Sequence, residues 1–257
     1  MPGLESGSIH RVPGRVESHR IFLKNNAMLT AAKTPSKTRT PKHLTMLVDG
    51  AATPKSRIWK HNEVVILSGA ERVFARAGFQ GATMAQIAEE AGVPKPNLHY
   101  YFGNKRDLYR AVLNRVLHDW LDPIDVITAD AEPRVALETY IRRKMALAFE
   151  RPDASRVFAN ELLHGAPVVG ELLRSDLRDI VLEKSRVIDV WIADGKIAPV
   201  DSTHLFFTLW ASTQTYADFD VQIQAVMGGE VPLPIAQERA TAHVLNIMLG
   251  ACGLRQG

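Results

Sequence analysis

The side chains best suited to bind a polyanion lie close together between residues 83 and 105. Lysines there could neutralise phosphates, tyrosine hydroxyls could donate to phosphate oxygens, and an asparagine and a histidine could read base edges. Backbone N–H groups at a helix start near residue 83 would point at the same strand. The segment therefore predicts binding to double-stranded DNA through Thr83, Lys95, Asn97, His99, Tyr100, Tyr101 and Lys105.

The three consecutive ring side chains of this segment also have a structural alternative. His99, Tyr100 and Tyr101 could pack between the DNA-binding unit and the rest of the protein. Three neighbouring residues on a helix cannot all face the same way. We expect at least one of the two tyrosines to contact phosphate.

The spacing around these residues is that of a helix-turn-helix. Thr83 and Gln86 can form a capping box that starts a helix of about two turns. Gly92 permits the positive φ of a tight turn, and a second short helix is expected after Pro94, as far as about Tyr101. This arrangement presents the second helix to a major groove about 12 Å wide.

Nothing in the sequence indicates an enzyme. No GxSxG, P-loop or GxGxxG motif occurs, and the single cysteine, Cys252, has no obvious activating partner. No two histidines have metal-ligand spacing; they are His10, His19, His43, His61, His99, His118, His164, His204 and His243. We expect no catalytic residue, no metal and no cofactor besides a small-molecule effector.

Charge is distributed unevenly along the chain. Residues 1–60 hold eleven Lys and Arg against three acids, whereas the other residues hold 20 against 25. A basic end on a mildly acidic body suits a protein with one end on nucleic acid. One cysteine, no signal peptide and no apolar run of about 18–20 residues favour a cytoplasmic protein away from membranes.

Hydrophobic periodicity predicts an all-α protein with three segments. Residues 1–54 are expected to be a disordered basic extension, 55–103 a helix-turn-helix DNA-binding domain, and 104–250 a ligand-binding and dimerisation domain. The first ordered helix should stop at Gly78. The later helices are expected at 104–120, 133–150, 152–163, 176–193, 203–226 and 234–250.

Three runs of the sequence together resemble the DNA-binding domain of the TetR family. They cover 70–79, 83–93 and 98–108, with matching spacing throughout. In that family the three residues before the closing Phe, and the Lys three residues after it, contact phosphates or bases. The resemblance therefore implies DNA contacts by His99, Tyr100, Tyr101 and Lys105.

The C-terminal part resembles a branch of the same family that regulates pyrimidine utilisation. The likeness implies a pyrimidine effector, uracil or thymine. Trp210 and Gln214 are four residues apart and share a helix face, so an indole could stack on the ring and a carboxamide could pair with its edge. Phe158 is a further pocket candidate. The alternative is that Trp210 is core and Gln214 bonds to a neighbouring helix. The segments that carry this likeness are 140–142, 154–158, 165–167, 183–185, 195–199 and 210–219.

The resemblance also implies a homodimeric repressor. The last two long helices would pair with those of a second copy in a four-helix bundle. Effector binding would move the 104–120 helix and change the spacing of the two recognition helices. Two alternatives stay open: a TetR-type repressor for another small amide or aromatic ligand, and a nucleoid protein that coats DNA through its basic tail.

Overall fold

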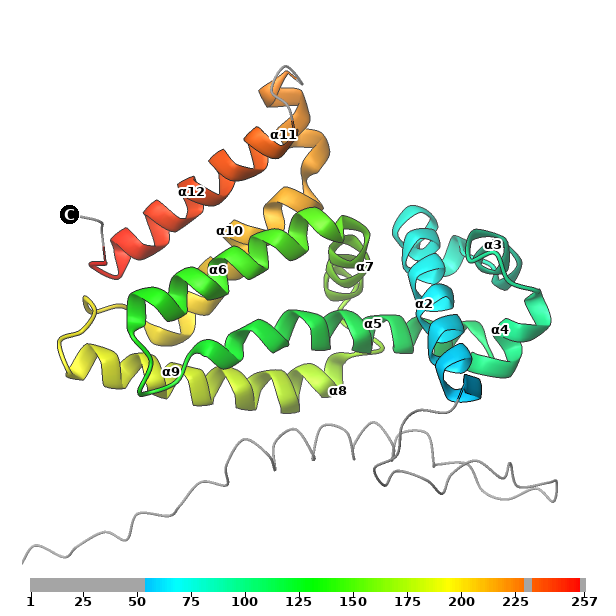
Figure 1. Ribbon diagram of the computed structural model, residues 1–257, viewed down its shortest axis with the longest axis horizontal. Coiled ribbons are helices and arrows are strands. Elements are labelled where there is room, and N and C mark those ends of the chain that lie inside the picture. The colour runs from blue at the N-terminus through cyan, green and yellow to red at the C-terminus, as the bar shows by residue number, and fades with distance from the viewer. Residues whose placement is uncertain (1–53, 229–232, 255–257) are drawn as a thin grey trace, which may run out of the picture. The chain divides into compact units, whose positions relative to one another are not determined.

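The computed structural model describes residues 54–228 and 233–254 (Figure 1). These two ranges form helices and turns and contain no β-strand. The prediction of an all-α fold is therefore confirmed. The basic extension predicted at 1–54 lies outside the described residues, apart from its last position.

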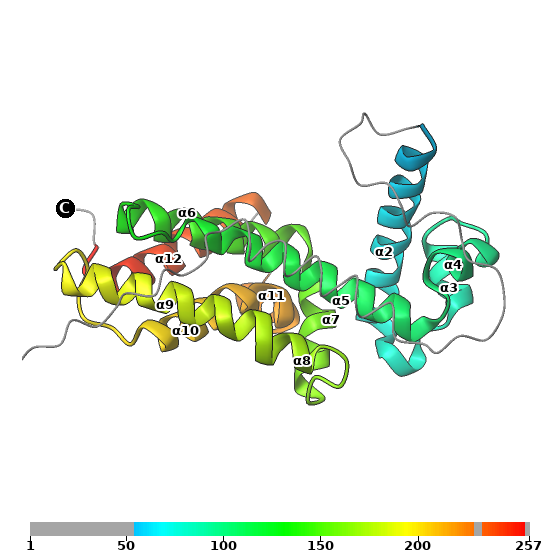
Figure 2. The same ribbon diagram turned by 90° about the horizontal axis from the view of Figure 1, so that it is seen from below.

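The helix-turn-helix region consists of three helices followed by a long connecting helix. They are α2 (Pro54–Gly81), α3 (Met84–Glu90), α4 (Lys95–Phe102) and α5 (Lys105–Leu121). Figures 1 and 2 show α5 extending from the α2–α4 unit into the larger group of helices. α5 therefore contributes to both regions, whereas the sequence predicts the 104–120 helix as part of the ligand-binding domain.

The larger region begins after α5. Its elements are η1 (Asp122–Val126), α6 (Pro133–Glu150), α7 (Pro152–Leu163), α8 (Gly170–Leu172), the π-helical turn η2 (Leu173–Leu177), α9 (Arg178–Ala193), α10 (Ser202–Asp218), α11 (Asp220–Met227) and α12 (Leu233–Ala251). α6 packs on α10 and α12, while α7 contacts both α2 and α10. α7 is thus a second connection between the two regions.

Local signals in the sequence account for several helix starts. Asn104 accepts a hydrogen bond from the N–H of Asp107 and caps α5. Asp201 accepts from the N–H groups of Thr203 and His204 and caps α10. Such side-chain caps satisfy backbone donors that have no partner inside the helix. Gly78 has φ 66°, so the regular helix breaks where its end was predicted, but α2 resumes after this kink and ends at Gly81.

Two predicted helices have the wrong boundaries. The 203–226 helix is broken at Phe219, where φ is −120° and ψ is 31°, so α10 and α11 are separate helices. The helix predicted to start at residue 176 instead continues back through the π-helical turn η2 to Gly170. The break at Phe219 has no proline or glycine to mark it, and hydrophobic periodicity alone could place neither boundary.

The apolar interior forms two clusters. The first joins α2, α3 and α4 to α5 and α7 and includes Phe74, Leu98, Trp120 and Phe158. The second lies among α6, α9, α10 and α12 and includes Tyr140. The DNA-binding unit therefore shares its core with α5 and α7.

Candidate nucleic-acid interface and effector site

The corner of the helix-turn-helix is built as the sequence predicts. The N–H of Gln86 donates to Thr83 Oγ1 at 3.2 Å, and the N–H of Thr83 donates to Gln86 Oε1 at 3.0 Å. Gly92 has φ 65°, in the left-handed region that favours glycine. The capping box and the turn together fix the direction in which α4 leaves α3.

α3 lies unusually close to α2. A Cβ on Gly69 of α2 would come within 2.8 Å of the Cβ of Ala91 and within 2.9 Å of its backbone. Arg72 and Arg76 on α2 both form ion pairs with Glu90 of α3, and their hydrogen bonds, that of Arg76 first, lower the pKa of Glu90. α2 and α3 are thus held together by close packing and by charge.

One face of α4 is exposed while the other is anchored in the core. Leu98 is fully buried against the first apolar cluster. Lys95, Asn97 and His99 are exposed, and Tyr100 is 77% exposed. Of the residues that the sequence predicts to contact DNA, these four therefore lie on the accessible surface of α4.

His99 is held in a defined orientation on this surface. Its Nδ1 lies 2.8 Å from the carbonyl oxygen of Gly103. A carbonyl can only accept, so Nδ1 carries the hydrogen, and in the neutral ring Nε2 is an acceptor. A neutral His99 would accept a hydrogen bond from a base rather than donate one.

Tyr101 and Lys105 are engaged within the protein. Tyr101 Oη accepts from Asn62 Nδ2 at 3.2 Å, and its ring lies 5.2 Å from that of Trp59. Lys105 Nζ donates to the carbonyl of Ala82 at 2.9 Å and lies 4.7 Å from the centre of the Phe79 ring. In this structure both side chains connect α4 and α5 to α2, while Tyr100 does not.

Trp210 and Gln214 share one face of α10, and both are half-buried. The indole Nε1–H of Trp210 donates to Tyr140 Oη of α6 at 2.9 Å. The Trp210 ring also packs against the rings of Phe206 and Phe207. The indole therefore has a structural role within the protein, and the stacking role predicted from the sequence stays a prediction.

Phe158 connects this region to α5. It is buried on α7, with its ring centre 5.8 Å from that of Trp120 on α5. The ammonium of Lys144 on α6 also lies close to the Trp120 ring, at 4.1 Å from the ring centre. Burial lowers the pKa of Lys144 to about 7.

The sequence reasoning missed Lys144, Ser155 and the role of Asp218. Ser155 Oγ donates a hydrogen bond to Asp218 Oδ1, joining α7 to the end of α10. Burial raises the pKa of Asp218, opposed first by this hydrogen bond. A usable signal was present, because Lys144 follows Tyr140 by four residues within the apolar stripe of α6.

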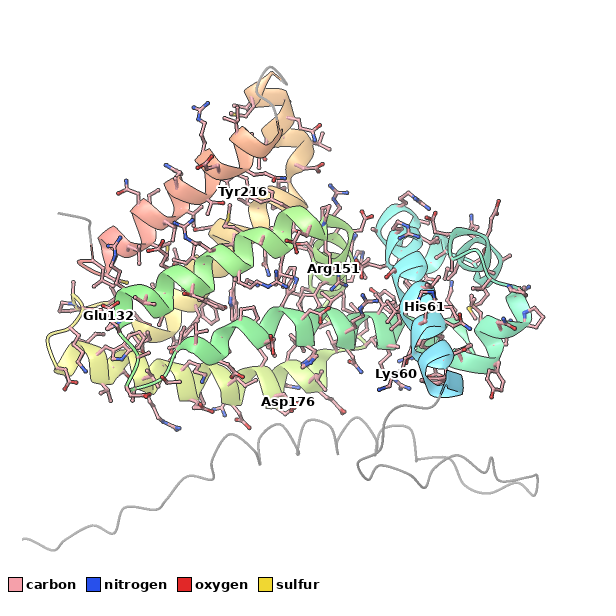
Figure 3. The ribbon with its side chains drawn as sticks, viewed as in Figure 1. Lys60, His61, Glu132, Arg151, Asp176 and Tyr216 are labelled. Atoms are coloured by element: carbon pink, nitrogen blue, oxygen red, sulfur yellow. The ribbon has the colours of Figure 1, made fainter. Side chains whose placement is uncertain are left out.

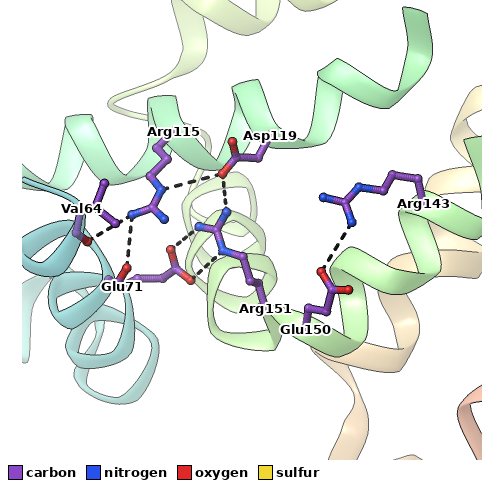
Figure 4. Close-up of polar contacts among 8 residues, drawn as sticks. Val64, Glu71, Arg115, Asp119, Arg143, Glu150 and Arg151 are labelled. Carbon is purple, nitrogen blue, oxygen red and sulfur yellow. Dashed lines mark hydrogen bonds and ion pairs between the residues drawn. The ribbon is translucent and has the colours of Figure 1, made fainter. Parts of the chain in front are cut away.

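An ion network joins the DNA-binding unit to the larger region. Arg151, between α6 and α7, pairs with Glu71 of α2 and with Asp119 of α5. Arg115 of α5 reaches Ser68 Oγ on α2 at 3.3 Å. Figure 3 shows Arg151 facing α2, and Figure 4 shows the network in detail. We call these four charged residues the α2–α7 joint: Glu71, Arg115, Asp119 and Arg151.

The part of the chain that the structure describes contains no cluster of three His, Cys, Asp or Glu side chains placed to hold a metal ion. In the same residues, every helix is too short or too polar to cross a lipid bilayer.

Two family models match consecutive parts of the chain. Residues 66–112 match the model for bacterial regulatory proteins of the tetR family. Residues 113–255 match the model for the C-terminal region of the YcdC-like protein. Together they cover the helix-turn-helix, α5 and the larger helical region.

Individual proteins support the same assignment. The chain is 42% identical to the HTH-type transcriptional regulator RutR of Escherichia coli over 195 residues, which are 76% of this chain and 92% of that relative. It is 33% identical to the HTH-type transcriptional regulator TtgR of Pseudomonas putida over 101 residues, 38% of this chain and 47% of TtgR.

Solved structures show the same fold at lower identity. A TetR-like transcriptional regulator from a Rhodococcus species superposes with a TM-score of 0.54 at 22% identity, over 75% of this chain and 96% of its own. A TetR transcription regulator from Haloarcula marismortui gives 0.52 at 23%, over 76% and 97%.

The structure and the comparisons agree with one another. α4 is exposed and is positioned by a capped corner, two family models match the chain, and the chain is similar to RutR. The chain belongs to the TetR family of DNA-binding transcriptional regulators, which are not enzymes.

Proposed function

We propose that this regulator is a homodimeric repressor that leaves its operator when a pyrimidine, uracil or thymine, binds among α5, α6, α7 and α10. The observation that carries the proposal is the half-buried polar face of Trp210 and Gln214 on α10. An aromatic plane beside a carboxamide suits a flat ring whose edge alternates N–H and C=O groups.

The DNA contacts are proposed for the exposed surface of α4. Tyr100 is free to donate to a phosphate, whereas Tyr101 is bonded to Asn62. With a duplex selected from a random library, Tyr100→Phe should weaken binding by roughly 3- to 10-fold, the effect of one hydrogen bond. Tyr101→Phe, the matched control, should have a smaller effect, because its hydroxyl faces α2.

Lys95 tests the electrostatic part of the interface. Replacing Lys95 by Ala should weaken binding to every DNA sequence. The slope of log K against log salt concentration should decrease by the amount expected for about one phosphate contact. An unchanged salt dependence for Lys95→Ala would exclude this contact. Equal affinity of the wild-type protein for every duplex would favour the nucleoid-coating alternative.

Dimerisation is supported by apolar side chains left exposed on the last helices. Phe207 on α10 and Ile247 on α12 are half-exposed, and others lie near the end of α10 and on α11. Apolar patches of this kind mark association surfaces. Light scattering should give twice the chain mass of 28.5 kDa for wild type and the single mass for Phe207→Glu with Ile247→Glu. A wild-type monomer would contradict the proposal.

The effector is tested by titrating the DNA complex. Uracil or thymine should reduce operator binding by wild type, and Gln214→Leu should bind DNA normally but no longer respond. If no pyrimidine releases the DNA, the alternative is a TetR-type repressor for another small amide or aromatic compound, which would keep the α4 interface. Release by an amide or aromatic compound would then support that alternative.

A further inference from the structure

Lys144 is a buried cation without a direct ionic partner. Its side chain points from α6 into the interior, and the residue is only 4% exposed. Within the described part of the chain, Nζ forms no ion pair or hydrogen bond, and its closest interaction is with the Trp120 ring. Asp218 attracts it electrostatically, but the two groups are not in direct contact.

A cation in this position needs an explanation. Transfer of an ammonium group from water to a protein interior is costly unless hydrogen bonds and opposite charges replace the lost water. An ammonium has three N–H donors, and an aromatic face satisfies them only in part. Lys144 therefore retains donors that a small polar molecule could use.

Two helices carry the surrounding polar groups in register. Tyr140 and Lys144 are one turn apart on α6, and Trp210, Gln214 and Asp218 follow at intervals of four on α10. The Tyr140–Trp210 hydrogen bond joins the two rows at one end. Lys144 and Asp218 attract each other farther along the two helices. Gln214 therefore lies on α10 between Trp210, which takes part in the first interaction, and Asp218, which takes part in the second.

The same place is where the two apolar clusters meet. Trp120 and Phe158 belong to the first cluster, and Tyr140 to the second. The Lys144 ammonium contacts Trp120, although Lys144 is next to Met145 of the second cluster. Charged groups at such a boundary interrupt an otherwise continuous core, which favours a binding role over a packing role.

We propose that Lys144 and Asp218 form the polar end of the effector site, where the ammonium donates to a ring carbonyl oxygen and the carboxylate accepts from the adjacent ring N–H. The inference rests on the proposed function, because it names how that site reads a pyrimidine. Gln214 would pair farther along the same edge, and Trp210 would cover the ring.

The proposal also defines which ligand chemistry fits. Uracil and thymine present a carbonyl beside an N–H, so one molecule can satisfy both a donor and an acceptor. A ring without the N–H could not donate to the Asp218 carboxylate, which would keep only its hydrogen bond from Ser155. Dihydrouracil keeps the C=O and N–H groups but is not flat, so it tests stacking separately from the polar contacts.

The closing experiment measures uracil binding by isothermal titration calorimetry. The variants are Lys144→Met and Asp218→Asn, with Lys184→Met as the matched control. Lys184 is also buried, on α9, but its Nζ is paired with Glu183 at 3.2 Å. We expect Lys144→Met to weaken uracil binding by roughly 10- to 100-fold, the effect of a lost charged hydrogen bond. Lys184→Met should bind uracil as wild type does.

The possible outcomes separate the inference from the proposed function. Equal uracil affinity of wild type and Lys144→Met would overturn the inference and leave the pyrimidine assignment intact. If uracil and thymine fail to bind wild type, the pyrimidine assignment fails, and the inference fails with it. Circular dichroism confirms that each variant is folded.

A further measurement uses the wild-type protein, so its result does not depend on whether a variant folds correctly. A carbonyl oxygen on Nζ favours the charged form of Lys144, whose pKa is about 7 in the free protein. Uracil binding at pH 7 should therefore take up as much as about half a proton per site. Titrations in buffers with different ionisation enthalpies measure this uptake, and no uptake would count against the contact.

Discussion

Two cations seven residues apart have opposite surroundings. Arg151 lies in the α2–α7 joint and is paired with Glu71 and Asp119, from two different helices. Lys144, at the boundary of the apolar clusters, is more deeply buried but has no carboxylate in direct contact. The guanidinium has a rigid planar set of donors for two carboxylates, whereas the ammonium is a compact charge whose pKa shifts on burial.

This difference distinguishes a structural cation from one suited to a ligand. Removing a partner from a satisfied buried ion pair leaves an uncompensated charge and destabilises the fold. Removing a poorly compensated charge from a core should instead stabilise the fold. The two residues should therefore respond in opposite directions to the same substitution.

The largest effect is expected at Arg151. Replacing it by Met leaves the Glu71 side chain, which is only 9% exposed, without its partner. We expect a loss of roughly 3–5 kcal/mol in the free energy of unfolding, measured with urea. Adding Glu71→Gln to the Arg151→Met variant should restore part of the lost free energy of unfolding. A loss below about 1 kcal/mol would show that Arg151 does not stabilise the joint.

Lys144→Met should instead stabilise the protein, most strongly at acid pH. The Lys144 pKa is about 7 in the folded state, against about 10.4 for an unfolded lysine. Between these two pH values the unfolded chain therefore binds more protons than the folded protein does. The free energy of unfolding of the wild-type protein consequently rises with pH across this range, as far as it depends on Lys144.

The gain from Lys144→Met should consequently be roughly 2–4 kcal/mol at pH 6 and at most about half of that at pH 9. Urea unfolding of both proteins at the two pH values measures it. A gain that does not depend on pH would mean that the ammonium is not buried as described.

The two carboxylates of the joint should differ from each other. Glu71 is nearly buried, whereas the Asp119 side chain is 33% exposed and can be solvated by water. Glu71→Gln should cost about 1–3 kcal/mol and Asp119→Asn less than about 1 kcal/mol. Chemical unfolding at pH 7 ranks the two variants, and the reverse order would contradict the burial of Glu71.

The smallest effect is expected for an exposed ion pair on the same helix as Lys144. Arg142 and Glu138 are four residues apart on α6, and the Arg142 side chain is largely exposed. Arg142→Ala should change stability by no more than about 0.5 kcal/mol. This variant shows what removing a charge from α6 does when no buried group is involved.

Much of the DNA-binding region could be predicted from the sequence because its signals are local. Thr83 and Gln86 are three residues apart and cap one helix, and Gly92 forms the turn that follows. Asn104 caps α5 in the same way. Such signals need no knowledge of distant residues.

The candidate effector site could be predicted only in part because its members come from four helices. The Trp210–Gln214 spacing is local, but the partner of Trp210 is Tyr140, 70 residues away. Ser155 and Asp218 are 63 residues apart. No periodicity reveals such pairs, and the break at Phe219 that ends α10 has no glycine or proline to indicate it.

The close approach of Gly69 to Ala91 has a consequence for regulation. Because no side chain fits between α2 and the end of α3 at that point, and because Arg72 and Arg76 pair with Glu90, we expect the two helices to move as one piece. In the homodimer proposed above, any change in the distance between the two DNA-reading surfaces would then occur outside this piece, at α5 and at the ion pairs of Arg151. Such a regulator would change the separation of its reading surfaces and leave their shape the same.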